Sequence, residues 1–224
     1  MRISLVTCMV LAALAVCTPH AQAGIFSGLF STRPSMEPYT GPDAGRLVMS
    51  VGGYRGANFG RYWLYFRTQD RTRSGDIGYA CGHTLGCADM LTFAASPATD
   101  YADNIEAADV IVLPLAPGDY EFYDFEVFYN STYAQSTFRS RGEFSIPFTI
   151  KPGEAVYLGE FRAMDVPGQN LIGLPVPAGA KFQIFDESAR DLPIARAKDP
   201  KITDVKVALP DVSKIGTPAF ERIP

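Results

Sequence analysis

The segment from Cys81 to Cys87 holds the residue types best suited to chemistry, because it places two thiols and one imidazole within seven positions. Two glycines let this short loop close, and cysteines in an oxidising compartment usually pair. We therefore expect a disulfide between Cys81 and Cys87 worth about 2 kcal/mol. The alternative is a metal site in which both thiolates, His83 and Asp89 supply the ligands. That spacing is not a standard zinc pattern, and the only other cysteines and histidine lie in the N-terminal segment that we expect to be removed, so we predict no metal and no other cofactor.

His83 is also the general base that a hydrolase would need, because His20 lies in a segment that we expect to be removed. The sequence has no G-x-S-x-G elbow, and a disulfide-bonded cysteine is not a nucleophile. Glu121, Asp124 and Glu126 lie close enough along the chain to suggest a glycosidase pair, but on a strand Glu121 faces away from the other two. The sequence also lacks a phosphate-binding glycine loop and a dinucleotide fingerprint. We therefore predict that the protein is not an enzyme.

Aromatic residues are dense between Tyr120 and Tyr133. Most of them are expected in a hydrophobic core, where aromatic side chains contribute large buried areas. Because both faces of this stretch are aromatic, one face can lie outside the core and stack on sugar rings. Tyr123, Tyr129 and Tyr133 are the residues that would face such a ligand. This interpretation gives the alternative function of a carbohydrate-binding module.

The elements that must position these residues are strands. Residues 144–150 alternate between apolar and polar side chains, which is typical of a strand with one buried face. Pro147 cannot donate a ladder hydrogen bond, so this strand is expected at a sheet edge, where strand addition by a partner is feasible. Residues 151–154 (KPGE) then form a turn. The full set of expected strands is 47–51, 61–67, 90–94, 110–113, 120–129, 144–150, 155–164 and 181–185.

The strand count and the short spacing of turns predict an all-β fold. The architecture that we expect over residues 45–186 is an antiparallel two-sheet sandwich of the Ig/transthyretin-like type, with a closed barrel as the competing solution. Residues 187–198 are expected to form a short helix, and the chain from there to residue 224 an irregular tail. Residues 24–44 are rich in proline and glycine, which predicts a flexible linker.

The stretch from Leu113 to Glu121 (LPLAPGDYE) resembles the L-x-P-G-x-Y signature of transthyretin-like and carboxypeptidase-regulatory-like sandwich domains. The segment FSIPFTIKPGEAVYLGEF, residues 144–161, is similar to uncharacterised exported bacterial domains with paired PG motifs. The resemblance implies a sandwich fold and carries no catalytic residue over to this chain. Beside it, Tyr120 fits a tyrosine corner, in which the phenol bonds a backbone group a few residues upstream.

The first 23 residues have the features of a secretory signal peptide. Arg2 gives a positive start, an apolar run follows, and Ala21 and Ala23 form a cleavage site. We therefore expect a periplasmic or secreted protein. The alternative is an outer-membrane lipoprotein, because the residues before Cys17 resemble a lipidation box, although Val16 is larger than that motif prefers.

The charge balance limits the partners. The chain has 20 basic and 24 acidic residues and a net charge of −4, and removal of Arg2 with the signal peptide makes the balance more acidic. Such a chain is a poor match for nucleic acid or for an anionic membrane surface. The sequence predicts an exported cell-envelope protein with a binding or structural role, whose partner is an envelope protein or a glycan. It contacts the membrane only if Cys17 is lipidated, and a metal-binding periplasmic protein is the remaining alternative.

Overall fold

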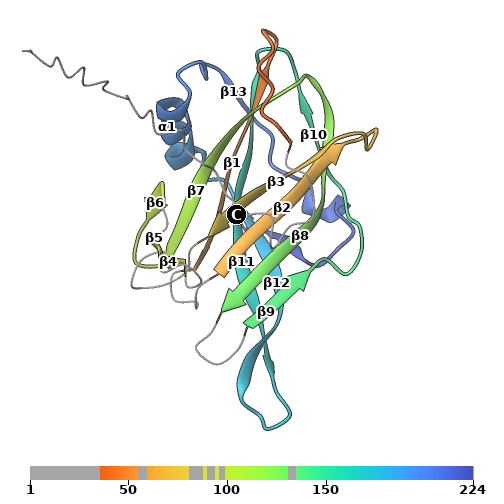
Figure 1. Ribbon diagram of the computed structural model, residues 1–224, viewed down its shortest axis with the longest axis vertical. Coiled ribbons are helices and arrows are strands. Elements are labelled where there is room, and N and C mark those ends of the chain that lie inside the picture. The colour runs from red at the N-terminus through yellow and green to blue at the C-terminus, as the bar shows by residue number, and fades with distance from the viewer. Residues whose placement is uncertain are drawn as a thin grey trace, which may run out of the picture. The chain divides into compact units, whose positions relative to one another are not determined.

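Alternating apolar and polar residues build two β-sheets and one helix in the computed structural model (Figure 1). The structure describes residues 36–54, 60–80, 88–89, 94–95, 99–130 and 135–223, and all of them lie in the compact unit Arg33–Pro224. The predicted signal peptide and Cys17 lie outside these residues. Residues 90–93 of the expected strand at 90–94 lie outside them as well.

The larger sheet has seven strands in the order β14-β12-β11-β1-β7-β6, with β13 beside β11. β1 pairs antiparallel with β7 but parallel with β11, and the β11–β13 and β12–β14 pairs are also parallel. The sheet is therefore mixed, and the prediction of purely antiparallel sheets is wrong for it. Its strands are β1 (Gly45–Tyr54), β6 (Tyr101–Ala102), β7 (Glu106–Leu115), β11 (Ala155–Gln169), β12 (Pro175–Phe185), β13 (Val205–Val207) and β14 (Phe220–Arg222).

The smaller sheet has five strands, all antiparallel, in the order β10-β8-β2-β3, with β9 beside β8. β10 lies at the edge of this sheet, as Pro147 predicts. A separate two-stranded ladder joins β4 (Ala88–Asp89) to β5 (Ala94–Ala95). The strands of the smaller sheet are β2 (Gly60–Thr68), β3 (Ser74–Ala80), β8 (Gly118–Asn130), β9 (Gln135–Arg139) and β10 (Ile146–Ile150).

The two sheets share one aromatic core. Phe122 of β8 and Phe161 of β11 have ring centroids 5.9 Å apart, and Phe125 and Phe182 approach to 5.4 Å. Every second residue of β1 faces this core, including Leu47, Met49 and Val51. Because side chains from both sheets form a single buried cluster, the all-β two-sheet fold is confirmed.

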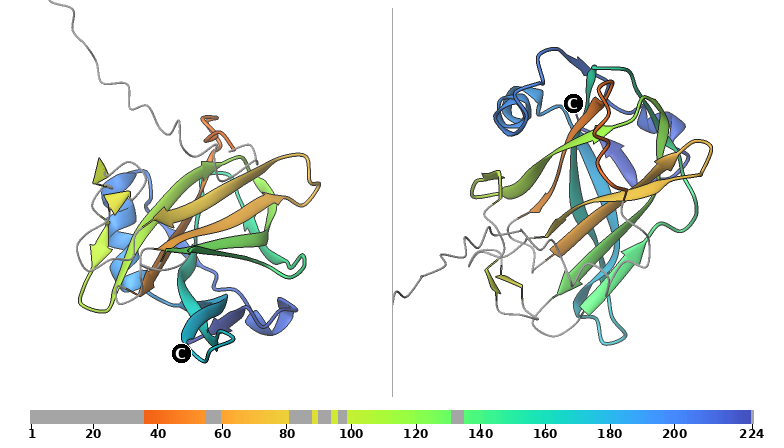
Figure 2. Two further views of the ribbon diagram at one scale, coloured as in Figure 1. Left: turned by 60° about the horizontal axis from the view of Figure 1, so that its bottom comes forward. Right: turned by 45° about the horizontal axis from the view of Figure 1, so that its top comes forward.

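The C-terminal segment covers the other face of the larger sheet. The expected helix is present as α1 (Ser188–Lys198), which packs beside Val48 and Tyr157 (Figure 2). The prediction of an irregular tail after it is wrong, because β13 and β14 join the larger sheet and a 3-10 helix, Val212–Lys214, lies between them. These strands have three residues each, which is too short for a two-residue alternation to be visible in sequence.

The described part of the predicted linker is attached to the domain. Tyr39 donates a backbone hydrogen bond to Pro114, Asp43 accepts one from Gly153, and Ala44 is buried. The prediction of a flexible linker is therefore wrong for residues 36–44. Residues 24–35 are not among those that the structure describes.

The connection from β7 to β8 passes from the larger sheet to the smaller one. Tyr120 lies just after this crossing, and its hydroxyl donates a 2.8 Å hydrogen bond to the carbonyl of Ala116, four residues upstream. Its ring is buried and stacks on Phe148 with a centroid distance of 5.4 Å. This is the geometry of a tyrosine corner.

Tyr120→Phe is expected to lower the free energy of unfolding by about 1 kcal/mol, because it removes one hydrogen bond and keeps the ring. Urea denaturation measures the change. Tyr39→Phe is the matched control, since the Tyr39 hydroxyl bonds Asp43 at the exposed surface. An equal effect of the two substitutions would contradict the corner.

Candidate functional site

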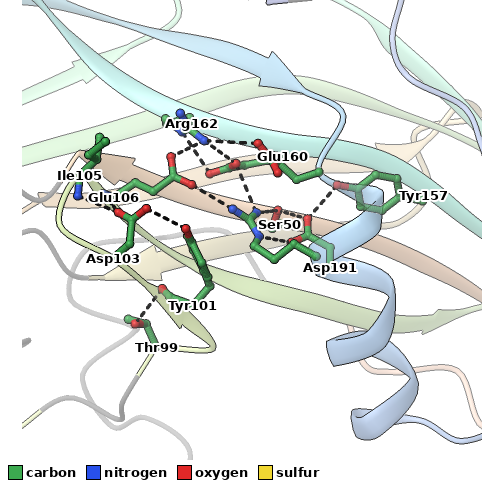
Figure 3. A network of polar contacts seen from close by, with 12 residues as sticks. Ser50, Thr99, Tyr101, Asp103, Ile105, Glu106, Tyr157, Glu160, Arg162 and Asp191 are labelled. Carbon is green, nitrogen blue, oxygen red and sulfur yellow. Dashed lines mark hydrogen bonds and ion pairs between the residues drawn. The ribbon is translucent and has the colours of Figure 1, made fainter.

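Under α1, the outer face of the larger sheet carries a group of polar side chains that pair with one another (Figure 3). We call this group the buried charge network. It holds three carboxylates and two guanidinium groups, together with two hydroxyl groups. Its members are Ser50, Glu106, Tyr157, Glu160, Arg162, Arg190 and Asp191.

A β-bulge at Gly159 brings Glu160 and Arg162 to this face. Along β11, Tyr157 points toward α1, and strict alternation would send Glu160 into the aromatic core. The register with β1 shifts between the pairs Val48–Tyr157 and Ser50–Glu160, so the strand gains one residue there. Gly159 has a φ of +100°, and a Cβ at this position would lie 2.8 Å from the carbonyl oxygen of Phe185. Glycine is therefore the residue that this bulge accommodates.

Asp191 of α1 is the centre of one half of the network. Its carboxylate accepts hydrogen bonds from the Ser50 hydroxyl and, at 2.7 Å, from the Tyr157 hydroxyl. The guanidinium of Arg190 donates a third hydrogen bond at 2.7 Å. Ser50 and Asp191 are both 0% exposed, so these contacts replace water entirely. The carboxylate remains buried because three donors satisfy it.

Two arginines bridge the carboxylates of the other half. Arg190 contacts Glu106 at 2.9 Å and Glu160 at 3.3 Å. Arg162 contacts Glu160 at 2.8 Å and also pairs with Glu106. Aromatic rings cover the guanidinium groups, since Arg162 lies 4.0 Å from the ring centroid of Phe185. The network therefore joins β7, β11 and α1 through paired charges.

The turn before β7 positions Glu106. Asp103 accepts backbone hydrogen bonds from Glu106 and Ile105, and the Tyr101 hydroxyl donates to it at 2.7 Å. The backbone bonds to Glu106 and Ile105, followed by the bond from Tyr101, lower the pKa of Asp103 to about 2. Tyr101 also lies under Arg190, with the guanidinium 4.3 Å from its ring centroid.

Burial and the neighbouring charges shift the pKa values of Glu106 and of the two arginines. Burial, followed by the charge of Glu160, raises the pKa of Glu106 to about 6. Burial alone would lower the pKa of Arg190, but the hydrogen bond to Asp191 and the charge of Glu160 raise it above its ordinary value. Both arginines stay charged, and Glu106 titrates near pH 6.

The arrangement is suited to holding α1 on the sheet. The helix contributes apolar contacts through Leu192, Ile194 and Ala195, and Asp191 adds buried polar contacts. The Ser50 hydroxyl bonds a carboxylate rather than an imidazole and has no exposed surface, so a substrate cannot reach it in this geometry. Within the described ranges, no group of three or more His, Cys, Asp or Glu side chains is arranged to hold a metal ion.

Asp191→Ala is expected to lower the free energy of unfolding by about 3 kcal/mol or more, because it leaves Arg190, Tyr157 and Ser50 without their shared acceptor in a buried site. Chemical denaturation measures the loss. The control is Asp204→Ala, an exposed aspartate expected to change stability by less than about 0.5 kcal/mol. A small effect at Asp191 would show that the network does not hold the helix.

Glu106 makes stability depend on pH. Its folded pKa of about 6 lies above the ordinary value of 4.5, so the folded state binds this proton more tightly than the unfolded state. Its contribution is present below pH 4.5 and is lost as pH rises through 6, a change of about 2 kcal/mol. Urea midpoints of the wild type and of Glu106→Gln at pH 5 and pH 7.5 test this. The wild type should lose more stability than the variant as pH rises, and equal losses would contradict the assignment.

The tyrosines expected to face a ligand differ in their exposure to solvent. Tyr129 is 5% exposed and packs in the core against Tyr62 and Phe138, so it is not a surface residue and the prediction is wrong for it. The large apolar area of its ring is buried on the inner face of β8. Tyr123 is partly exposed, with the Arg67 guanidinium 4.2 Å from its ring centroid. Tyr133 is not described.

The segment from Cys81 to Cys87 also lies outside the described part of the chain. The disulfide between Cys81 and Cys87, and the alternative metal site that includes His83, therefore stay predictions.

A bulge in β8 between Phe122 and Asp124 puts both Phe122 and Phe125 in the core. Glu121 and Glu126 therefore share the outer face, and the prediction that they face opposite ways is wrong. Glu121 bonds Arg67 at 2.8 Å, and Glu126 bonds Arg139 at 2.8 Å.

A depression of about 290 Å³ lies where β8 begins. It contains no histidine or cysteine, so it offers no nucleophile–imidazole pair. The lining residues are Thr68, Gln69, Asp70, Arg73, Pro117, Gly118, Asp119 and Tyr120.

The hairpin between β11 and β12 has no counterpart among the sites expected from the sequence. β1 pairs with β11 up to Ala163, and β14 pairs with β12 from Phe182 onward. Between these points β11 and β12 pair with each other and extend beyond the neighbouring strands, at the bottom of Figure 1. Six residues of β11, from Met164 to Gln169, give this ribbon a length of about 20 Å.

The end of the ribbon exposes large aliphatic side chains. Leu171 is fully exposed, Ile172 is 78% exposed and Leu174 is 54% exposed. We call these three residues the apolar tip. No charged residue occurs from Val166 to Ala180. Several large aliphatic side chains exposed in one loop, as distinct from single exposed ones, are a candidate for an interaction site.

Asn170 fixes the conformation of the tip. Its side-chain carbonyl accepts hydrogen bonds from the backbone N–H groups of Ile172 and Leu174, at 3.1 and 2.9 Å. Its own N–H donates to Leu174, and its backbone carbonyl accepts from Gly173, whose φ is +79°. This is a tight hairpin loop with glycine in the left-handed region, and it presents Leu171 and Ile172 outward.

Comparison with known proteins gives no relative. No protein-family model matches the chain, no curated protein matches its sequence, and no solved structure matches its fold. In the part of the chain that the structure describes, no helix has the length and apolar character to span a membrane.

Proposed function

We propose that the protein is an exported, non-enzymatic binding protein of the cell envelope, and that the apolar tip is its contact site. The observation that carries this proposal is the exposure of Leu171, Ile172 and Leu174 at the end of a projecting ribbon that has no charged residue from Val166 to Ala180. Export rests on the sequence of residues 1–23. A non-enzymatic role is supported by the carboxylates of β8 and of the buried charge network, which are held in ion pairs.

The energetics favour a contact at the tip. Burying three large aliphatic side chains contributes roughly 5 kcal/mol before the costs of association. The loss of translational and rotational freedom on association offsets much of this gain, so the tip alone gives a weak affinity. A loop already fixed by Asn170 loses little further conformational entropy on binding.

Strand addition along the ribbon is less favourable than contact through its tip. Pro167 and Pro177 oppose each other in the ladder, and neither has an N–H to offer to an added strand. The finer fold assignment, an Ig- or transthyretin-like sandwich, is part of the same proposal. It is supported by the tyrosine corner at Tyr120 and by the antiparallel smaller sheet.

Site-specific crosslinking in cells tests the function. A photo-crosslinking amino acid in place of Leu171 should give adducts with an envelope component, protein or lipid, identified by mass spectrometry. The same amino acid in place of Val207 is the matched control, because Val207 is 45% exposed and β13 pairs at the opposite end of β11. Adducts that are equally abundant at both positions, or absent at both, would contradict the proposed contact site.

A further inference from the structure

We infer that the component bound by the apolar tip is the surface of a phospholipid bilayer with zwitterionic headgroups, into which Leu171, Ile172 and Leu174 insert. This inference rests on the proposed function and names its partner. A bilayer accepts a convex apolar protrusion without a preformed pocket, whereas a protein partner must supply a matching cavity.

Four backbone N–H groups of the tip are satisfied within the loop itself. An N–H group that enters hydrocarbon without an acceptor is unfavourable, because no water replaces the lost hydrogen bond. The N–H groups of Asn170, Ile172, Gly173 and Leu174 all have acceptors within the loop itself. The loop can therefore enter the bilayer surface with these donors satisfied.

The side chains of the tip offer few of the contacts that a protein interface uses. Specific protein interfaces carry about one hydrogen bond per 100–200 Å² and a polar rim around the apolar centre. From Leu171 to Leu174 no side chain can donate or accept a hydrogen bond. The Asn170 carbonyl beside them is already engaged within the loop. An uncharged aliphatic surface of this kind matches acyl chains better than a rimmed interface.

The nearest charges set the depth of insertion. Asp165 lies opposite Ala180 in the ladder, and Lys181 lies opposite Met164. Asn170 lies five positions after Asp165 in the chain, which corresponds to about 16 Å of ribbon. This exceeds the roughly 5–10 Å depth of the headgroup and acyl boundary. The tip can reach that boundary while the charged side chains at the base stay in water.

The net charge of the protein favours a zwitterionic membrane surface over an anionic one. The chain carries a net charge of −4, so an anionic lipid surface repels it as a whole. Insertion of the tip gives an attraction that is apolar in origin and does not require basic residues. Binding is therefore expected on zwitterionic vesicles and expected to weaken as anionic lipid is added.

Vesicle flotation with the full chain tests the inference, using vesicles of phosphatidylcholine alone. The wild type should float with the vesicles, and Leu171→Ser/Ile172→Ser should bind more weakly by about tenfold for each side chain removed. The matched control is Val207→Ser, which removes a comparably exposed aliphatic side chain from β13 and should leave binding unchanged. All three chains keep the same N-terminal segment, and equal urea midpoints establish that they are folded alike.

A fluorescence measurement locates the tip directly. Ile172→Trp should shift its emission to shorter wavelength on phosphatidylcholine vesicles and be quenched by lipids brominated on the acyl chain. Val207→Trp should show neither change. The native Trp63 is present in both variants and gives the same background.

The outcomes separate the inference from the proposed function. Vesicle binding that the double substitution leaves unchanged, or emission of the Ile172→Trp variant that vesicles do not alter, would overturn the bilayer as partner. If vesicles are not bound but the crosslinker at position 171 captures one defined envelope protein, the inference fails and the proposed function stands. If the tip neither binds vesicles nor gives adducts, both fail.

Discussion

The pairing of β11 on both of its edges is the constraint on which the other features depend. β1 lies along one edge from Arg46 to Gly53, while β13 and β12 share the other edge. This pairing fixes the first half of β11 at the centre of the larger sheet. Beyond Ala163 the strand continues with β12 as its partner, so the same strand that builds the core also projects the apolar tip.

The Gly159 bulge gives one strand two kinds of buried environment. Before it, Val156 and Leu158 face the aromatic core, and after it Phe161 and Ala163 do. On the other face of β11, Tyr157 packs among apolar residues beside α1. After the bulge this face carries Glu160, which pairs with Arg190. The helix is thereby held by the apolar contacts of Leu192, Ile194 and Ala195 and by ion pairs, which are costly to bury but add specificity to its position. The network and the tip therefore have different roles, one internal and one external.

Much of the fold could be predicted from the sequence, because alternation is a local signal. Residues 144–150 alternate cleanly and form a strand at a sheet edge, as Pro147 indicates. β3 was not predicted, since Ile77 is its buried aliphatic residue and the rest of its sequence is typical of a polar loop. β13 and β14 depend on parallel pairing with distant strands, and no local pattern reports such pairing.

The candidate sites were harder to predict for different reasons. The network joins residues as far apart in sequence as Ser50 and Asp191. Its one local signal is that the apolar core residues of β11 move from even to odd positions across Gly159. The uncharged stretch between Asp165 and Lys181 is visible in sequence, but its exposure follows from where pairing with β1 ends.

Hydrogen exchange of the full chain with and without phosphatidylcholine vesicles tests most directly the central claim, which is that the apolar tip inserts into a bilayer. We predict that vesicles slow exchange within residues 164–181 and leave β13 unchanged; unaltered exchange in the ribbon would contradict the account.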